Sequence, residues 1–264
     1  VERFVRPALL AVQNPMSDDA PSLKGAEAEV QAIQACGAHS TQSVLVGQDA
    51  TKSAFINHVQ QLASANDPYV VHLACHGIHS TRWESGIVLA GADRFTVGDT
   101  IGFRFGDHCR LCVASACSTA LNDSLTDPAS ENIGLPSVLL VAGVPCVVAS
   151  LWPVDDFATA LLMERLYHAL SEGATVSSAL STAQSWLRSL TSSQITSNLR
   201  DKSRELSQHW EAFRTAVRQS RNVSDVEATH DPDSIETDST PLASPYFWAA
   251  FIVTGDGGVR THPC

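Results

Sequence analysis

The chain has 264 residues, enough for one large domain or two small ones and for a sizeable buried core. Hydrophobic residues make up 44% and charged residues 17%, which is typical of a globular protein and excludes a disordered chain or a coiled coil. The net charge of −11 disfavours nucleic acid as a partner, because phosphate binding needs a basic face, but it permits a cationic peptide as substrate.

Apolar runs alternate with helix-spaced runs through the first half of the chain. Strands are predicted at 8–12, 44–46, 69–74, 87–90 and 111–115, and helices at 23–35 and 51–63, with Asp49 or Thr51 available to cap the second helix. Strands that are apolar on both faces and alternate with helices predict a mostly parallel sheet with helices on both sides. Catalytic groups of such a sheet gather beyond the carboxyl ends of its strands.

The stretch between Glu131 and Asp155 holds 23 residues without a charge, which is long enough to span a bilayer. The stretch is interrupted by Pro136, Gly143, Pro145 and Pro153, so we predict a buried helix at 135–142, a buried strand at 146–151 and no membrane span. A helix at 156–170, two polar helices within 175–220 and an apolar strand at 247–253 complete the pattern.

The segment 188–243 separates its charges. It holds seven basic and three acidic residues up to position 221, and then six acids without Lys or Arg from Asp225 to Asp238. We expect a helical and acidic-loop insertion that acts as a lid or a partner surface and is dispensable for folding. The domain would then cover 1–257, and 258–264 would form a tail.

Seven cysteines show no regular framework, and three of them lie inside apolar runs. This usage predicts reduced thiols in a cytoplasmic protein. The chain begins with Val and no signal-peptide pattern follows, so we expect it to be part of a longer protein.

Two predicted strands end in residues that can carry nucleophilic chemistry. Residues 70–77 read VVHLACHG and residues 111–120 read LCVASACSTA. If the two parallel strands are neighbours, His76 and Cys117 face each other although they are 41 positions apart. A nearby imidazole raises the thiolate fraction of a cysteine, so Cys117 is the candidate nucleophile and His76 its base.

Gly77 lacks a Cβ, so its N–H can point into the site and, with the N–H of Cys117, stabilise an oxyanion. Two other interpretations compete with the dyad. A cysteine at a strand end is often an inert buried residue. His72, Cys75 and His76 could bind a metal, but their spacing on a strand does not bring them together, and we predict no metal and no cofactor.

A third strand end, ASLWPVDD at 149–156, also opens a helix. Asp155 can cap that helix and Asp156 can favour its positive end. A carboxylate at this edge could instead receive a basic substrate side chain, and both interpretations can be true. We assign the cap to Asp155 and the pocket role to Asp156, with both acids at the proposed S1 pocket.

Five blocks appear in an order and spacing that resemble the CHAT domain, a caspase-like peptidase domain related to caspases and separase. They are HLACHG at 72–77, ASACSTA at 114–120, GL at 134–135 leading to VAGVP at 141–145, SLWPVDD at 150–156 and PYFWAAF at 245–251, and the resemblance covers about residues 5–257. The chain departs from the family pattern at Ser118, where the family often has Glu, and in the segment 188–243, which is longer than usual for the family.

The resemblance implies a caspase-haemoglobinase α/β fold, a mostly parallel central sheet flanked by helices. It also implies that His76 is the base, that Cys117 is the nucleophile, that Gly77 lines the oxyanion site and that an acid near Asp156 shapes the S1 pocket, as in separase. Family members often carry helical repeats N-terminal to this domain and cleave partner proteins.

The leading hypothesis is therefore a cysteine endopeptidase that forms the protease module of a larger protein. Its substrate would be a protein or peptide, and we expect neither nucleic acid nor a membrane as a partner. The alternative is a non-catalytic interaction or scaffold module of the same fold, against which the intact His76 and Cys117 argue. A small-molecule acyltransferase or hydrolase that uses the same thiol is a third, weaker reading.

Overall fold

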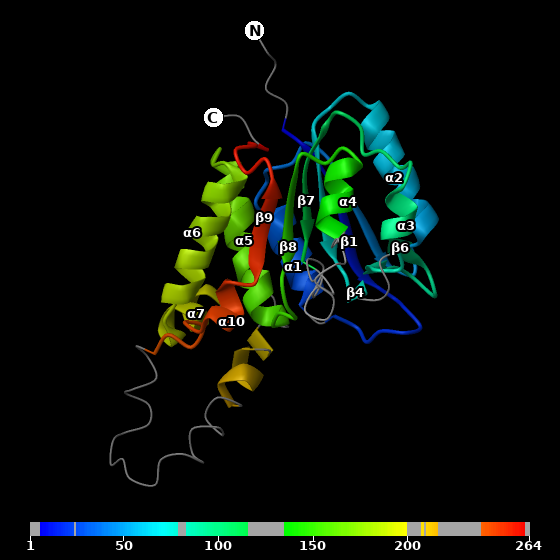
Figure 1. Ribbon diagram of the computed structural model, residues 1–264. Helices are drawn as coiled ribbons and strands as arrows, with labels where there is room; N and C mark the ends of the chain where they lie inside the picture. The colour runs from blue at the N-terminus through cyan, green and yellow to red at the C-terminus, as the bar shows by residue number, and fades with distance from the viewer. Residues whose placement is uncertain are drawn as a thin grey trace, which may run out of the picture.

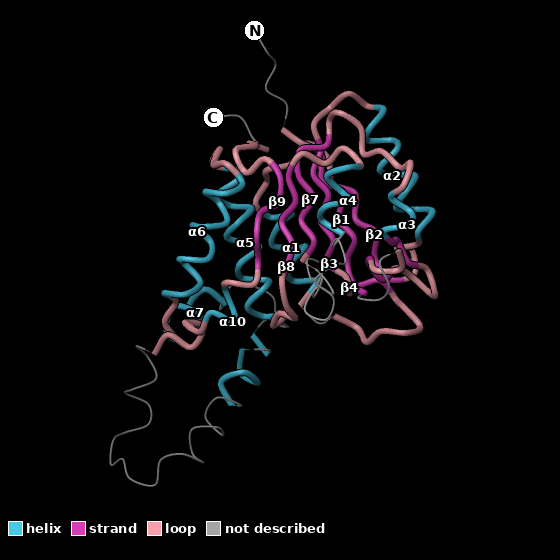
Figure 2. The backbone as a smooth tube through the Cα atoms, in the orientation of Figure 1, coloured by secondary structure: helices cyan, strands magenta, loops and turns pink. Residues whose placement is uncertain are grey.

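The computed structural model describes residues 6–23, 25–78, 83–115, 135–199, 207–208, 210–215 and 239–261. A six-stranded sheet runs through its centre in the order β2-β1-β3-β7-β8-β9 (Figures 1 and 2). The first five strands are parallel and β9 is antiparallel to β8. The strands are β1 (Ala8–Pro15), β2 (Gln42–Gly47), β3 (Tyr69–Ala74), β7 (Cys109–Ala114), β8 (Cys146–Ser150) and β9 (Phe251–Gly255). The predicted mostly parallel sheet is confirmed.

Helices cover both faces of this sheet. Those predicted at 23–35, 51–63, 135–142 and 156–170 begin and end close to these positions, whereas the short helices at 97–100 and 245–248 were not predicted. The described helices are α1 (Ala26–Ala35), α2 (Lys52–Ser64), α3 (Val97–Thr100), α4 (Leu135–Val141), α5 (Asp156–Ser171), α6 (Val176–Ser189), α7 (Ser192–Leu199) and α10 (Pro245–Trp248). Thr51 caps α2 by accepting a hydrogen bond from the Ala54 N–H at 3.2 Å. No helix among the described residues combines the length and the apolar character that crossing a bilayer requires.

Two predicted strands have a different place or extent. The strand predicted at 87–90 lies in a small antiparallel sheet of β4 (Gly77–Ile78), β5 (Gly86–Val88) and β6 (Arg94–Thr96), outside the central sheet. The strand predicted at 247–253 begins only at Phe251, because residues 245–248 form α10. Pro245 at the start of α10 supplies a backbone angle that suits the first helical turn.

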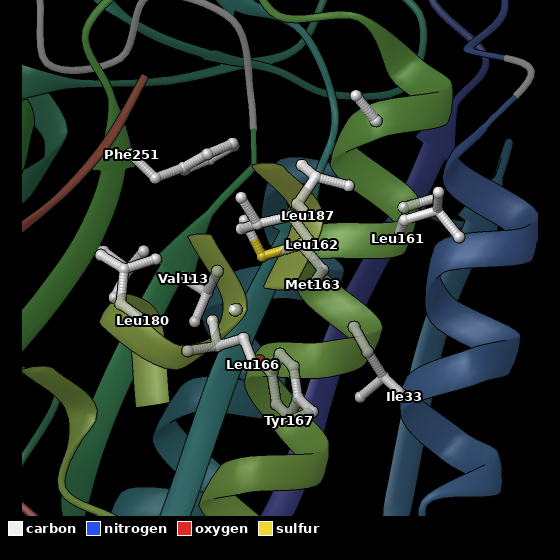
Figure 3. Close-up of a cluster of buried hydrophobic side chains, with 14 of the residues drawn as sticks. Ile33, Val113, Leu161, Leu162, Met163, Leu166, Tyr167, Leu180, Leu187 and Phe251 are labelled. Atoms are coloured by element: carbon white, nitrogen blue, oxygen red, sulfur yellow. The ribbon is translucent and has the colours of Figure 1, made fainter. Parts of the chain in front are cut away.

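The hydrophobic core has two halves, one on each face of the sheet. On one face, α1, α5 and α6 pack against alternate residues of the strands, and Figure 3 shows Leu162, Met163 and Leu166 of α5 converging on Val113 of β7. On the other face, α2, α4 and the small sheet cover the remaining residues. Helix α5 is buried almost all round because α1 and α6 flank it.

The described parts of the segment 188–243 pack into the core, which argues against the expectation that this segment is dispensable for folding. Ile195, Leu199, Trp210 and Leu242 are all buried in the core half that contains α5. The Trp210 ring stacks on Phe157 of α5 with ring centroids 5.6 Å apart. The charge pattern did not indicate this packing, because the aromatic and aliphatic residues are spaced among polar ones. The acidic stretch 225–238 lies outside the described residues.

The predicted tail also packs on the domain as far as it is described. The Arg260 guanidinium donates to the Gly173 carbonyl at 2.7 Å, and the Val176 N–H donates to the Val259 carbonyl at 3.0 Å. Thr261 is buried. The described residues just after the predicted boundary at 257 therefore pack on the domain.

Candidate active site

The two strands expected to carry the dyad are neighbours. β3 pairs with β7 in parallel, with Leu73 opposite Ala114, so the chain leaves both strands at the same edge of the sheet. Cys75, His76 and Gly77 follow one strand, and Ser115 follows the other. Cys117 lies outside the described residues, two positions beyond Ser115.

His76 is held by a backbone carbonyl. Its Nε2 lies 2.7 Å from the carbonyl oxygen of Pro21, in the loop between β1 and α1. A carbonyl only accepts, so Nε2 carries the proton of this hydrogen bond. In the neutral ring Nδ1 is then the acceptor, which is the role that a general base for a thiol requires.

The N–H of Gly77 is not used by the small sheet. Gly77 lies opposite Ile87 in the antiparallel β4–β5 pair, and the Val88 N–H donates to the His76 carbonyl at 2.9 Å. This pattern makes Gly77 and Ile87 a non-hydrogen-bonded pair of the ladder. The geometry therefore leaves the Gly77 N–H available beside His76, as an oxyanion donor must be.

The two acids after β8 have different surroundings. Asp155 is the N-cap of α5 and its Oδ1 accepts from the Ala158 N–H at 2.9 Å, so the capping role is observed. Asp156 makes no hydrogen bond or ion pair within the described residues, and it faces a small pocket. Of the two acids that we assigned to the pocket, Asp156 lines it and Asp155 is not among its described lining residues.

This pocket lies at the carboxyl edge of the sheet, between the first turns of α1 and α5. Its described lining residues come from the loop before α1, from α1, from the ends of β3 and β7 and from the start of α5: Leu23, Gly25, Ala26, Glu29, Ala74, Cys75, Ser115, Val154, Asp156 and Thr159. Cys75 directly precedes His76, and Ser115 stands two positions before Cys117. The pocket therefore adjoins both predicted catalytic positions along the chain.

A buried polar cluster lies behind the pocket. His72 of β3 is fully buried, with Nε2 2.9 Å from Glu29 Oε1 and Nδ1 3.2 Å from the Tyr167 hydroxyl of α5. The sequence interpretation missed Glu29 and Thr159 as pocket residues. A signal was present, because Glu29 falls on the same inward stripe of α1 as Ala26, Val30 and Ile33.

The thiols of the central sheet have no reactive character. Burial raises the pKa of Cys109 and of Cys146 to about 12, and raises the pKa of Cys112 well above its usual value. A thiol that stays protonated is a poor nucleophile. The close spacing of Cys109 and Cys112 therefore provides no reactive thiol pair. The described part of the chain contains no group of His, Cys, Asp or Glu residues arranged to hold a metal ion.

The fold is that of the caspase-like cysteine peptidases. The chain superposes on the Arg-specific cysteine proteinase gingipain R (RgpB) with a TM-score of 0.53 and 10% identity, covering 98% of this chain and 48% of that one. It therefore spans about half the length of the gingipain chain. Caspase-1 from Spodoptera frugiperda gives a TM-score of 0.47 at 14% identity, covering 96% of this chain and 87% of that one. The Drosophila initiator caspase Dronc gives 0.45 at 12% identity, with coverages of 69% and 73%.

The family follows from the sequence. The CHAT domain profile matches residues 2–256, and the chain belongs to the CHAT domain family. The resemblance drawn from the five sequence blocks is confirmed. No curated protein matches the chain in sequence.

Proposed function

We propose that this CHAT domain is a cysteine endopeptidase that uses Cys117 and His76. The observation that carries the proposal is the shared edge of β3 and β7, where His76 is already held by the Pro21 carbonyl at 2.7 Å. A scaffold module would have no need of an imidazole held by a backbone carbonyl at the edge where the chain leaves β3 and β7. The alternative, a non-catalytic interaction module, gains no specific support from the geometry.

The reaction begins when His76 Nδ1 takes the proton of the Cys117 thiol. The thiolate attacks the carbonyl carbon of the scissile peptide, and the N–H groups of Gly77 and Cys117 stabilise the oxyanion. His76 then gives its proton to the leaving amine, and a thioester joins Cys117 to the acyl part of the substrate. Water, deprotonated by His76, attacks the thioester and releases the acid and the free thiol.

Asp156 shapes the S1 pocket in this proposal, and Asp155 acts through the cap that fixes the start of α5. A carboxylate without a hydrogen-bond partner among the described residues suits a basic substrate side chain. The strongly acidic chain favours the approach of cationic peptides. The same proposal includes a protein as the substrate and helical repeats elsewhere in the full-length chain.

The nucleophile is tested by incubating the chain with a peptide library and identifying the cuts by mass spectrometry. Cys117→Ala should lower kcat/KM by several orders of magnitude with an unchanged circular dichroism spectrum. Cys36→Ala, at the partly exposed end of α1, is the matched control and should cut as the parent does. Loss of cutting in Cys75→Ala or Cys112→Ala, with cutting retained in Cys117→Ala, would show that the nucleophile is misassigned.

The base is tested separately from the substrate. His76→Ala should reduce cutting by about 10²–10⁴-fold, and should slow alkylation of Cys117 by iodoacetamide at neutral pH because the thiolate loses its partner. His58→Ala, in a partly buried position on α2, is the control. An alkylation rate that is the same in both variants and the parent would exclude the dyad.

A further inference from the structure

Glu29 is a buried carboxylate that the proposed mechanism does not use. Its relative exposure is 4%, and it lines the pocket from α1 while Asp156 lines it from α5. Burying a carboxylate costs free energy unless the carboxylate is paired and hydrogen-bonded. The needs of the helix do not explain this burial, because the exposed Glu27 already places a negative charge in the first turn of α1.

His72 is close to Glu29 without satisfying it. Nε2 and Oε1 are 2.9 Å apart, yet neither atom has a well-directed hydrogen bond within the described residues. On the other side of the ring, the Tyr167 hydroxyl stays protonated because burial raises its pKa well above the usual value, so it can donate to Nδ1. The Tyr167 hydroxyl thus serves Nδ1, and Glu29 Oε1 retains acceptor capacity that the His72 ring does not use.

A second acceptor lines the same pocket from α5. Thr159 is 4% exposed, and its hydroxyl oxygen has no hydrogen-bond partner within the described residues. A threonine inside a helix commonly donates to the carbonyl one turn earlier, and here that bond is not formed. Glu29, Thr159 and Asp156 therefore bring three groups with unused acceptor capacity to one small pocket.

We propose that Glu29 is a specificity-determining residue of this pocket and that Glu29, Asp156 and Thr159 together bind the guanidinium group of an arginine side chain. The inference rests on the proposed function for its substrate, a peptide that places arginine before the scissile bond. It adds a second carboxylate, on α1, to the acid expected from the sequence.

The shape of the donors decides between arginine and lysine. A guanidinium group carries five N–H donors in one plane and is weakly hydrated, so it can serve acceptors on opposite walls of a narrow pocket. An ammonium group is a compact, strongly hydrated charge with three donors. Carboxylates on α1 and α5, with a hydroxyl on α5, match the first pattern better than the second.

The direct test measures binding of n-butylguanidinium and of n-butylammonium to the intact chain by calorimetry or NMR titration, without any proteolysis. The parent should bind the guanidinium at least about tenfold more tightly than the ammonium ion, because each lost charge-assisted hydrogen bond costs roughly a factor of ten or more. Glu29→Gln should weaken guanidinium binding by about tenfold or more. Glu27→Gln removes the same charge from the exposed face of the same helix and should bind as the parent does.

A second variant keeps the inference testable if Glu29→Gln does not fold by circular dichroism. Thr159→Val preserves shape and charge, and should reduce the preference for guanidinium over ammonium. Unchanged guanidinium binding in folded Glu29→Gln would overturn the inference. If Glu29→Gln is unfolded, an unchanged preference of Thr159→Val for guanidinium over ammonium would overturn it as well. A parent chain that does not bind guanidinium would also overturn it.

Failure of this inference and failure of the proposed function give different results. Guanidinium binding that depends on Glu29, without any peptide cut in the library, would reject the endopeptidase and leave the pocket standing. Cuts that depend on Cys117 but show no preference for arginine, in a chain that does not bind butylguanidinium, would reject the pocket and leave the endopeptidase standing.

Discussion

The two faces of the central sheet differ in how their buried polar groups are hydrogen-bonded. On the face covered by α2, α4 and the small sheet, the α2 face, the Tyr69 hydroxyl donates to the Phe105 carbonyl, and in neighbouring α3 the Thr100 hydroxyl donates to the Val97 carbonyl at 2.6 Å. On the face covered by α1, α5 and α6, the α5 face, Glu29 and His72 lie close without a directed hydrogen bond. The α2 face satisfies its polar groups with backbone carbonyls, whereas the α5 face leaves acceptors open to a pocket.

We expect this difference to separate residues that only stabilise the core from residues that also bind a ligand. An unsatisfied buried polar group costs about 1–3 kcal/mol, and a protein is stable by only about 5–15 kcal/mol. Buried groups of this kind are therefore candidates for a binding role. We therefore expect substitutions on the α2 face to act on stability, and substitutions around the pocket on the α5 face to act on binding as well.

The largest stability effect is expected on the α2 face. Phe55 of α2 is 1% exposed and meets Phe95 edge to face at 5.1 Å. Phe55→Ala should lower the free energy of unfolding by about 3–5 kcal/mol, measured by urea denaturation, because it leaves a cavity. Guanidinium binding by the fraction that remains folded should not change. Ile101→Ala, 65% exposed, should stay within about 0.5 kcal/mol of the parent.

A smaller effect is expected where α1 and α5 meet. A Cβ at Gly25 would lie 2.9 Å from both the Cβ and the carbonyl oxygen of Asp156, so Gly25→Ala must push the two helix starts apart. We expect a loss of about 1–3 kcal/mol together with weaker guanidinium binding. Gly98→Ala in α3, whose new Cβ would meet its nearest atom at 3.3 Å, is the control and should leave binding unchanged. Full binding by Gly25→Ala would contradict the pocket geometry.

The polar cluster offers a finer comparison. Tyr167→Phe removes the hydroxyl that faces His72 Nδ1 at 3.2 Å and should destabilise the protein by about 1 kcal/mol in thermal or urea unfolding. Tyr246→Phe, at a site that is 48% exposed, should have no measurable effect. Equal stabilities of the two variants would mean that the cluster on the α5 face contributes nothing to folding.

The smallest effect is a pH dependence on the α2 side. Burial raises the pKa of Asp99, but hydrogen bonds from Lys52 and Thr96 outweigh it and hold the pKa below its usual value. A depressed pKa contributes stability above the unfolded pKa of about 3.9, and this stability is lost as the pH falls through the folded pKa. Asp99→Asn should thus be less stable than the parent by under about 1 kcal/mol near neutral pH, with the gap closing in acid. A gap that widens in acid would reverse this sign.

The sequence by itself determined the fold class and the edge of the sheet where chemistry is expected. Strands apolar on both faces require cover on both sides, and parallel strands end at one edge, so His76 and the end of β7 had to lie together once β3 and β7 paired. Local signals also sufficed for the caps, since Thr51 and Asp155 act within one turn of their own helices.

Only the tertiary structure decided what shares a pocket and what belongs to the core. Glu29 and Asp156 belong to helices far apart in the chain, and α1 packing on α5 brings them to one pocket. Trp210 became a core residue by stacking on Phe157, although its surroundings in sequence are polar. The physical reason is the same in both cases: a short-range pattern encodes which face of an element is apolar, but which distant face it meets depends on the packing of the whole chain.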